Sequence, residues 1–146
     1  MAPAAEDGAP VHRTRTRVRY PETDRMGVAY HAHYLVWFEL GRTEMMRAVG
    51  APYGELEDEA GILFPVIEAG ARYLRPARYD DVVAIDTTVR AVGGARVRFE
   101  YALSREADGE QLATGFTEHA SVGRDGRPTR LPAELRERLL ETREGE

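Results

Sequence analysis

Hydrophobic and polar residues change their spacing several times along this chain, and each spacing predicts a different element. In residues 11–20 the odd positions hold one valine and four arginines, and the even positions from 14 on hold threonine, valine and tyrosine. This alternation predicts a strand with one solvated face. From about Tyr30 to Val49 the apolar residues recur at helical spacing, and the first half of this segment is apolar almost all round. A helix without a polar face is buried, so we expect the rest of the chain to wrap it.

Two glycines mark features of this predicted helix. Gly50 stands where the helix should end, because glycine accepts the left-handed cap conformation and Pro52 cannot continue a helix. Gly41 lies inside the helix, where glycine costs about 1 kcal/mol relative to alanine. We therefore expect another stretch of backbone to pass close to Gly41.

The remainder of the chain predicts strands separated by tight turns. Residues 53–61 form an acidic connection, and a short amphipathic helix begins near Pro132. Tight turns force neighbouring strands to pair antiparallel. We expect an α+β domain in which a curved antiparallel sheet of about five strands surrounds one long helix. Beyond the first, the expected strands span residues 62–79 with interruptions at two prolines, 82–92, 96–103 and 111–122.

Length and composition predict one folded domain. A chain of 146 residues builds one core but not two, so residues 11–146 are expected to form a single domain. Residues 1–10 are rich in alanine and proline and lack the basic start and apolar core of a secretory signal. We expect a flexible tail there and a cytoplasmic location. No apolar run reaches the length needed to span a bilayer.

Missing residue types exclude several kinds of chemistry. The chain has no cysteine and no lysine, which excludes disulfides, thiolate nucleophiles and Schiff bases. Its two serines, Ser104 and Ser121, lie outside any Gly-x-Ser-x-Gly motif. The net charge of −5 does not favour nucleic acid as a partner. Catalysis must therefore rely on carboxylates, histidine, tyrosine or threonine.

Candidate catalytic groups gather where the first strand gives way to the helix. Asp24 precedes Gly27, a turn residue, and the neighbouring Tyr20 and His31 flank it along the chain. No Ser, Thr, Asp or Asn stands at residues 30–33 to cap the helix. Its first N–H groups are therefore free to stabilise developing negative charge, as attack on a thioester requires. Composition alone favours a simpler interpretation, in which Asp24 forms a turn and the histidines are structural.

The same residues carry a family resemblance. Residues 20–34 read Tyr-x-Glu-Thr-Asp-x-x-Gly-Val-x-Tyr-His-x-x-Tyr, and residues 73–81 read Tyr-x-x-Pro-Ala-Arg-x-Asp-Asp. From about Arg17 to Leu131 the chain closely resembles the 4-hydroxybenzoyl-CoA thioesterase family of hot-dog-fold proteins. Within that family it is most similar to the YbgC-type acyl-CoA thioesterases associated with the Tol-Pal system.

The resemblance implies a fold, an activity and catalytic residues. It implies a hot-dog fold in homodimers or homotetramers with active sites at the subunit interface. It implies hydrolysis of an acyl-CoA thioester to a carboxylic acid and coenzyme A, with Asp24 as nucleophile or general base. Tyr20 and His31 would orient Asp24 or the water, and the backbone N–H of His31 would polarise the carbonyl. No metal and no cofactor is implied beyond coenzyme A as part of the substrate.

The residues of the binding pocket are less closely defined. We expect Met26, Gly27, Val28 and Phe64 to contact the substrate, and arginines to pair with the phosphates of coenzyme A. The candidate arginines are Arg72, Arg75 and Arg78. Two alternatives remain open: a thioesterase for chains bound to acyl carrier protein, and a non-catalytic acyl-binding or scaffold partner of an envelope complex.

Overall fold

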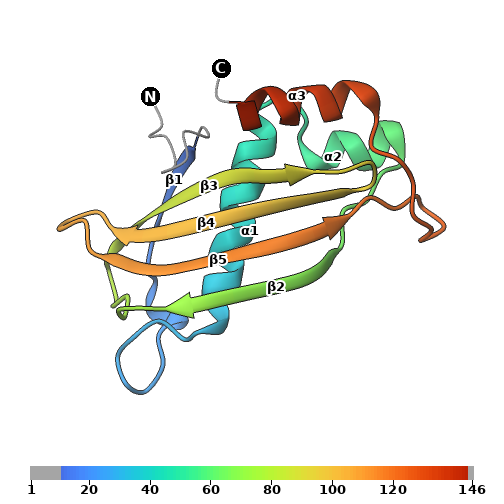
Figure 1. The fold of residues 1–146 in the computed structure, drawn as a ribbon. Coiled ribbons are helices and arrows are strands. Elements are labelled where there is room, and N and C mark those ends of the chain that lie inside the picture. The colour runs from blue at the N-terminus through green and yellow to red at the C-terminus, as the bar shows by residue number, and fades with distance from the viewer. Residues whose placement is uncertain (1–10, 145–146) are drawn as a thin grey trace.

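The structure, a computed structural model, describes residues 11–144 and the side chains as far as residue 141. The tail predicted for residues 1–10 lies outside the described residues. Five antiparallel strands form one sheet in the order β1-β3-β4-β5-β2, which confirms the predicted α+β architecture (Figure 1). The strands are β1 (His12–Arg17), β2 (Val66–Tyr73), β3 (Val82–Val92), β4 (Arg96–Arg105) and β5 (Gln111–Ala120).

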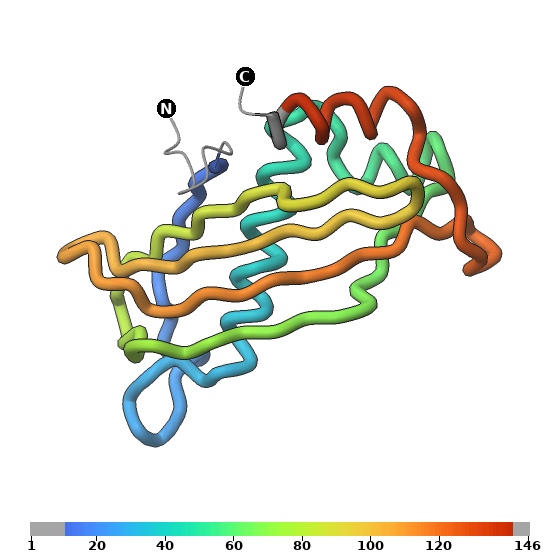
Figure 2. The backbone as a smooth tube through the Cα atoms, viewed as in Figure 1, coloured from blue at the N-terminus to red at the C-terminus, as the bar shows by residue number. Residues whose placement is uncertain are grey.

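One long helix, α1 (Ala32–Ala48), crosses a single face of this sheet, behind the strands in Figure 1. It ends as expected, because Gly50 takes a φ of 83° and its N–H bonds to the carbonyl of Arg47. Figure 2 shows the C-terminal helix α3 lying along the top of the sheet, near the end of α1. The smaller elements are η1 (Tyr20–Glu22), α2 (Tyr53–Glu55), the π-helical turn η2 (Leu56–Ala60) and α3 (Ala133–Glu144).

The core forms between α1 and the strands that it crosses. Trp37, Phe38, Met45 and Met46 of α1 are all buried. The ring of Phe38 stacks flat on that of Tyr101, with 4.4 Å between the ring centres. Gly115 of β5 lies against the same ring, and a Cβ there would overlap Phe38. The apolar residues predicted at helical spacing therefore make the core.

The curved sheet wraps α1 from one side, as predicted, and part of the opposite side of the helix stays open to solvent. Leu35 is 42% exposed and Val36 is 52% exposed. The physical reason is that one sheet is a single layer and covers one side of a helix. β2, a free edge of the sheet, also exposes apolar side chains, namely Val66, Ile67 and Tyr73.

A chain of hydrogen bonds runs through the interior beside this core. The hydroxyl of Tyr101 is 2.5 Å from Thr117 Oγ1, which is 2.9 Å from His119 Nε2. His119 Nδ1 is 3.1 Å from the carbonyl oxygen of Phe64. Because that carbonyl only accepts, Nδ1 carries the proton and Nε2 accepts from Thr117. Burial lowers the pKa of His119 to about 4. The hydrogen bond to Phe64 raises this pKa in part, and the positive charge of Arg42 lowers it further. This histidine is therefore neutral.

We predict that Gly41→Ala destabilises the protein although alanine favours helices. An added Cβ would lie 2.7 Å from Ile85 Cγ2 and would overlap the hydroxyl of Thr87, so side chains of β3, rather than the backbone we expected, exclude it. Overpacking of this kind costs about 1–3 kcal/mol, which exceeds the gain in helix propensity. Urea unfolding measures the difference. Gly54→Ala is the control, because nothing lies within 4 Å of that position, and an equal effect of both changes would contradict the prediction.

We also predict an acid-sensitive contribution to stability from His119. Its pKa is about 4 in the folded chain and 6.5 in the reference state, so the unfolded chain binds the extra proton between these values. The contribution is complete above pH 6.5 and falls as the pH drops towards 4, by at most about 3 kcal/mol in total. Unfolding free energies of the wild type and His119→Gln, measured from pH 7.5 to 4, should converge on acidification. Parallel curves would show that His119 does not titrate in this way.

Candidate active site

The residues around Asp24 form a small hairpin, here called the Asp24 loop (Glu22–Tyr30), which projects from the lower end of the sheet in Figure 1. The N–H of Asp24 bonds to the carbonyl of Val28 at 2.9 Å, and the N–H of Tyr30 bonds to that of Glu22 at 2.8 Å. The N–H of Gly27 bonds to the carbonyl of Asp24, and Gly27 takes a φ of 81°. Aspartate at the first position and glycine at the fourth are typical of such a turn.

The side chain of Asp24 takes part in this turn. Its Oδ1 accepts a hydrogen bond of 2.8 Å from the N–H of Met26, as expected for an aspartate that forms a turn. No described residue donates a hydrogen bond to Oδ2, and the residue is half-buried. The carboxylate is therefore held by one oxygen, and the structural role leaves the other available for chemistry.

α1 begins directly after the Asp24 loop and has no side-chain cap. His31 is the N-cap residue, and its side chain makes no capping hydrogen bond to the N–H groups of the first turn. The carbonyls of Tyr30 and His31 accept from the N–H groups of His33 and Tyr34, but no described residue accepts a hydrogen bond from the N–H of His31. Two residues lie between His31 and Val28, the residue opposite Asp24, so the two are at most about 10 Å apart along an extended chain. The positive end of the helix thus lies beside the carboxylate loop.

Tyr73, at the end of β2, contacts the start of α1 and is not among the predicted site residues. Its hydroxyl donates to the carbonyl of His31 at 3.3 Å. Its ring centre lies 6.1 Å from that of His31 and 5.0 Å from that of Tyr34. The one signal for it in the sequence is its place at the head of the Tyr-x-x-Pro-Ala-Arg motif. Tyr73 joins the edge strand to the helix N-terminus.

Glu22 is a second unpredicted residue, a buried carboxylate at the corner between β1 and the Asp24 loop. Its Oε1 accepts a hydrogen bond of 2.7 Å from the N–H of Arg19 and lies 3.7 Å from the guanidinium of Arg19. These contacts compensate for burying the charge. Glu22 therefore fixes the direction in which the loop leaves the strand.

The predicted catalytic side chains share one end of the molecule but are not joined by hydrogen bonds. Tyr20 is 74% exposed and packs edge to face on Tyr79, with 6.0 Å between the ring centres. His31 is exposed and lies against Tyr30. Within the described part of the chain, no hydrogen bond connects the side chains of Tyr20, Asp24 and His31. One chain brings their backbones together and leaves these side chains open to a substrate.

The predicted pocket residues fall into two groups. Met26 and Gly27 are exposed at the tip of the Asp24 loop, and Val28 is half-buried beside it. Phe64 precedes β2 and lies near Tyr53, with 6.0 Å between their ring centres. Eight residues of mostly extended chain lie between Phe64 and Tyr73, which places the two about 25–30 Å apart. Phe64 is therefore remote from the Asp24 loop of its own chain.

An open hollow of about 1050 Å³ lies elsewhere, on the sheet face that points away from α1. Phe116 lines it and neighbours Gly115, which faces α1, so the two residues lie on opposite faces. Arg72 is the one predicted phosphate-binding arginine among the lining residues. The Asp24 loop contributes no residue to this hollow, which therefore lies apart from the candidate site.

Residues 11–141 hold no group of three histidine or acidic side chains arranged to bind a metal ion. No helix in the described part of the chain is long and apolar enough to cross a membrane.

In sequence, the chain is similar to a family of thioesterases and to several of its named members. The family model of the thioesterase-like superfamily matches residues 18–139. The putative acyl-CoA thioesterase YneP of Bacillus subtilis is 33% identical over 115 residues, which cover 79% of this chain and 82% of that protein. The acyl-CoA thioesterase YbgC of Haemophilus influenzae is 34% identical over 120 residues, covering 82% and 88%.

Solved structures agree with the fold. The crystal structure of the DHNA-CoA thioesterase from Staphylococcus aureus superimposes with a TM-score of 0.85 and 31% identity, over 90% of this chain and 89% of that one. The five-stranded antiparallel sheet with its long helix and this match confirm the predicted hot-dog fold. The matched region contains the Asp24 loop, α1 and all of β2 to β5.

Proposed function

Because this chain belongs to the thioesterase-like superfamily, we propose that it hydrolyses an acyl-CoA thioester at the Asp24 loop, with Asp24 as the reacting carboxylate. It is a thioester hydrolase, as its relatives are named. The observation that supports the proposal is that the Asp24 loop leads directly into a helix whose N-terminus no side chain caps. The carboxylate of this loop and the helix N-terminus are the two groups that thioester hydrolysis needs.

The start of α1 binds the carbonyl oxygen in this proposal. The thioester oxygen accepts a hydrogen bond from the N–H of His31, and the positive end of the helix stabilises the negative charge that develops there. A donor of this kind contributes about 3–4 kcal/mol when it is already in place. Tyr73 donates a hydrogen bond to the carbonyl of His31, in the following peptide, and so holds the residue that carries this N–H.

Asp24 acts through its second oxygen, because Met26 holds Oδ1. On one route Oδ2 attacks the thioester carbon, the carbon–sulfur bond breaks, and the CoA thiolate leaves and takes a proton. Water then cleaves the resulting anhydride to the free acid and restores Asp24. On the other route Asp24 accepts a proton from water, whose hydroxide attacks the same carbon, and the proton passes to the leaving thiolate. The Tyr20 and His31 side chains orient the carboxylate or the water.

In this proposal the active form of the enzyme is a homodimer. β2 is an edge strand that exposes Val66, Ile67 and Tyr73, and α1 exposes Leu35 and Val36 on the side that the sheet leaves open. Edge strands and apolar surfaces of this kind are covered in stable proteins. Antiparallel pairing of β2 with a second copy would bring Phe64 of one copy beside Tyr73 of the other. Phe64 would then line the acyl pocket of the opposite subunit.

The substrate carrier is coenzyme A rather than a carrier protein in this proposal, because the relatives are named for acyl-CoA substrates. The reaction uses no metal and no cofactor. A panel that contains acyl-CoA and acyl-carrier-protein thioesters separates the two carriers. Tight acyl-CoA binding without turnover of either kind would instead favour the non-catalytic binding role.

We predict that Asp24→Asn lowers kcat for acyl-CoA by about 100-fold or more, because asparagine neither attacks a thioester nor accepts a proton from water. Steady-state hydrolysis of short-chain and aromatic acyl-CoAs measures this effect. Asn preserves the acceptor for the Met26 N–H, so the turn itself should persist.

Asp125→Asn is the matched control for Asp24→Asn. Asp125 makes the same kind of side-chain contact, since its Oδ1 accepts a hydrogen bond of 3.0 Å from the N–H of Arg127, two residues further on. Full activity of Asp24→Asn would refute the assignment. Hydroxylamine added during turnover separates the routes, because it converts an Asp24 anhydride into an aspartyl hydroxamate that mass spectrometry detects.

We predict that the wild type sediments as a dimer or larger assembly and that Ile67→Glu sediments as a monomer. A charge in the middle of an apolar interface loses its solvation without gaining a partner. Ala91→Glu is the control, because this residue is also exposed on a strand but lies on β3, away from the β2 edge. Sedimentation velocity at micromolar concentration decides the matter, and a monomeric wild type would contradict the dimer.

A further inference from the structure

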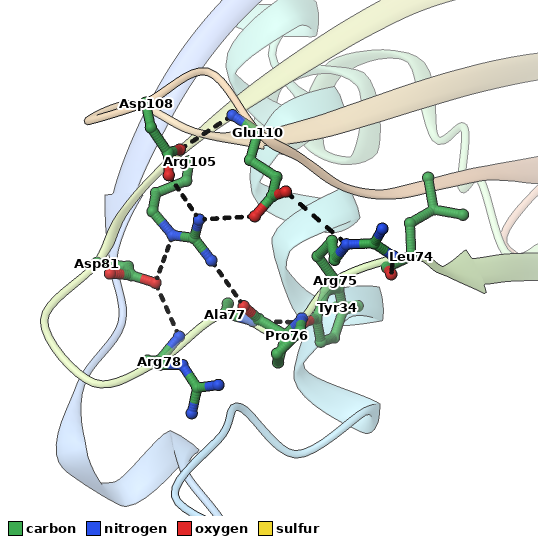
Figure 3. Close-up of polar contacts among 10 residues, drawn as sticks. All are labelled: Tyr34, Leu74, Arg75, Pro76, Ala77, Arg78, Asp81, Arg105, Asp108 and Glu110. Atoms are coloured by element: carbon green, nitrogen blue, oxygen red, sulfur yellow. Dashed lines mark hydrogen bonds and ion pairs between the residues drawn. The ribbon is translucent and has the colours of Figure 1, made fainter.

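Arg105, at the end of β4, is surrounded by three carboxylates from two different connections of the chain (Figure 3). Its guanidinium lies 3.1 Å from Asp81, 3.0 Å from Asp108 and 3.1 Å from Glu110. Only 16% of this side chain is exposed. The hydrogen bonds to Asp81 and Glu110 raise the pKa of Arg105, so it remains a cation at any pH at which the protein is folded.

The guanidinium also holds the backbone that precedes β3. Its remaining nitrogen, Nη2, donates a hydrogen bond of 3.0 Å to the carbonyl of Pro76. Asp81, already paired with Arg105, accepts a hydrogen bond of 2.9 Å from the N–H of Arg78. Both ends of the segment from Pro76 to Asp81 are therefore attached to one side chain, as Figure 3 shows.

This segment in turn holds the active site. The carbonyl of Ala77 accepts a hydrogen bond of 2.8 Å from the N–H of Ala29, and Val28 forms an antiparallel bridge with Arg78. The N–H of Ala77 donates to the hydroxyl of Tyr34 in the first turn of α1, at 3.3 Å. Ala77 is fully buried. One residue next to the Arg105 contact therefore touches both the Asp24 loop and α1.

We propose that Arg105 is a positioning residue for the active site: through Pro76, Ala77 and Arg78 it sets the place of the Asp24 loop against the N-terminus of α1. Arg105 does not contact the Asp24 loop, and its effect on catalysis rests on the proposed function of that loop. The proposal also assigns a role to the Tyr-x-x-Pro-Ala-Arg-x-Asp-Asp motif, whose Pro76, Ala77 and Asp81 are the residues that transmit the contact.

Lysine cannot replace Arg105 in this role. A guanidinium offers five N–H donors in a fixed plane, whereas an ammonium is a single point with three donors. The Arg105→Lys side chain would keep the charge but would not reach the three carboxylates and the Pro76 carbonyl together. The segment from Pro76 to Arg78 would then shift, and with it the Asp24 carboxylate.

The experiment compares Arg105→Lys with the wild type and with Arg98→Lys. Arg98 lies at the other end of β4 and also pairs with two carboxylates, Glu100 at 3.2 Å and Glu118 at 3.6 Å. We expect Arg105→Lys to lower kcat for acyl-CoA by about tenfold, because displacements of about 1 Å reduce rates by up to about 100-fold. KM should change by less than about twofold, since Arg105 does not touch the substrate. Arg98→Lys should leave both constants within about twofold.

Hydrogen exchange tests the positioning without any assay of activity. In Arg105→Lys the amides of Ala29 and Ala77 should exchange about tenfold faster, while the amides shared by β3 and β4 keep the wild-type rate. Arg98→Lys should not show this local change. If the wild type itself turns over no acyl-CoA, the proposed function fails, and the exchange data still decide whether Arg105 positions the loop.

Three results would overturn the proposal. One is an unchanged kcat in Arg105→Lys, the second is a rise in KM alone, and the third is faster exchange spread evenly over the sheet, which indicates global destabilisation. If Arg105→Lys does not fold, Asp81→Asn carries the same test, because it removes the charge that joins Arg105 to the N–H of Arg78. It is expected to change kcat and the Ala29 amide in the same direction, and a normal kcat would overturn the proposal.

Discussion

One constraint shapes this protein: α1 must bury its apolar residues on a sheet that is one layer thick. Phe38 packs against Tyr101 and Gly115, which brings the helix close to the sheet. The distance is so short that only glycine fits at position 41, next to side chains of β3. Since the sheet covers one side only, Leu35 and Val36 stay exposed. The same packing carries the first turn of α1 to the end of β2 and to the Asp24 loop, so the site is a result of how the core is built.

Much of the fold could be predicted because it depends on local chemistry. A run of β-forming residues between two turns predicted the limits of β3 to the residue, and Gly50 ends the helix where its backbone takes a positive φ. The order of the strands could not be predicted in this way, because alternation reports which face a residue occupies and not which strand lies beside it. The exposure of Leu35 and Val36 could not be predicted for a related reason. Periodicity shows that a helix surface is apolar but not whether the same chain covers it.

The candidate site likewise has features that could be predicted from the sequence and features that could not. Asp24, Gly27 and the uncapped start of the helix are neighbours in sequence, so their meeting could be expected, although Asp24 also proves to form the turn. Tyr73 and Arg105 act over more than 40 and more than 20 residues of chain, through His31 and through Pro76. In a chain whose 20 basic residues are all arginine, nothing in the sequence distinguishes Arg105 from the others. Its importance arises from the backbone carbonyl and the carboxylates that only the fold places around it.

The strand order also has a consequence for how the molecule assembles. β3, β4 and β5 are consecutive and pair as neighbours, whereas β1 pairs with β3 across some 70 residues and β2 with β5 across some 50. Closing such long loops is slow and costs entropy before it is compensated, so we expect the two edge strands to join after the central meander has formed. The Asp24 loop follows β1, and Tyr73 ends β2. A chain whose edge strands have not yet docked would therefore lack the candidate site.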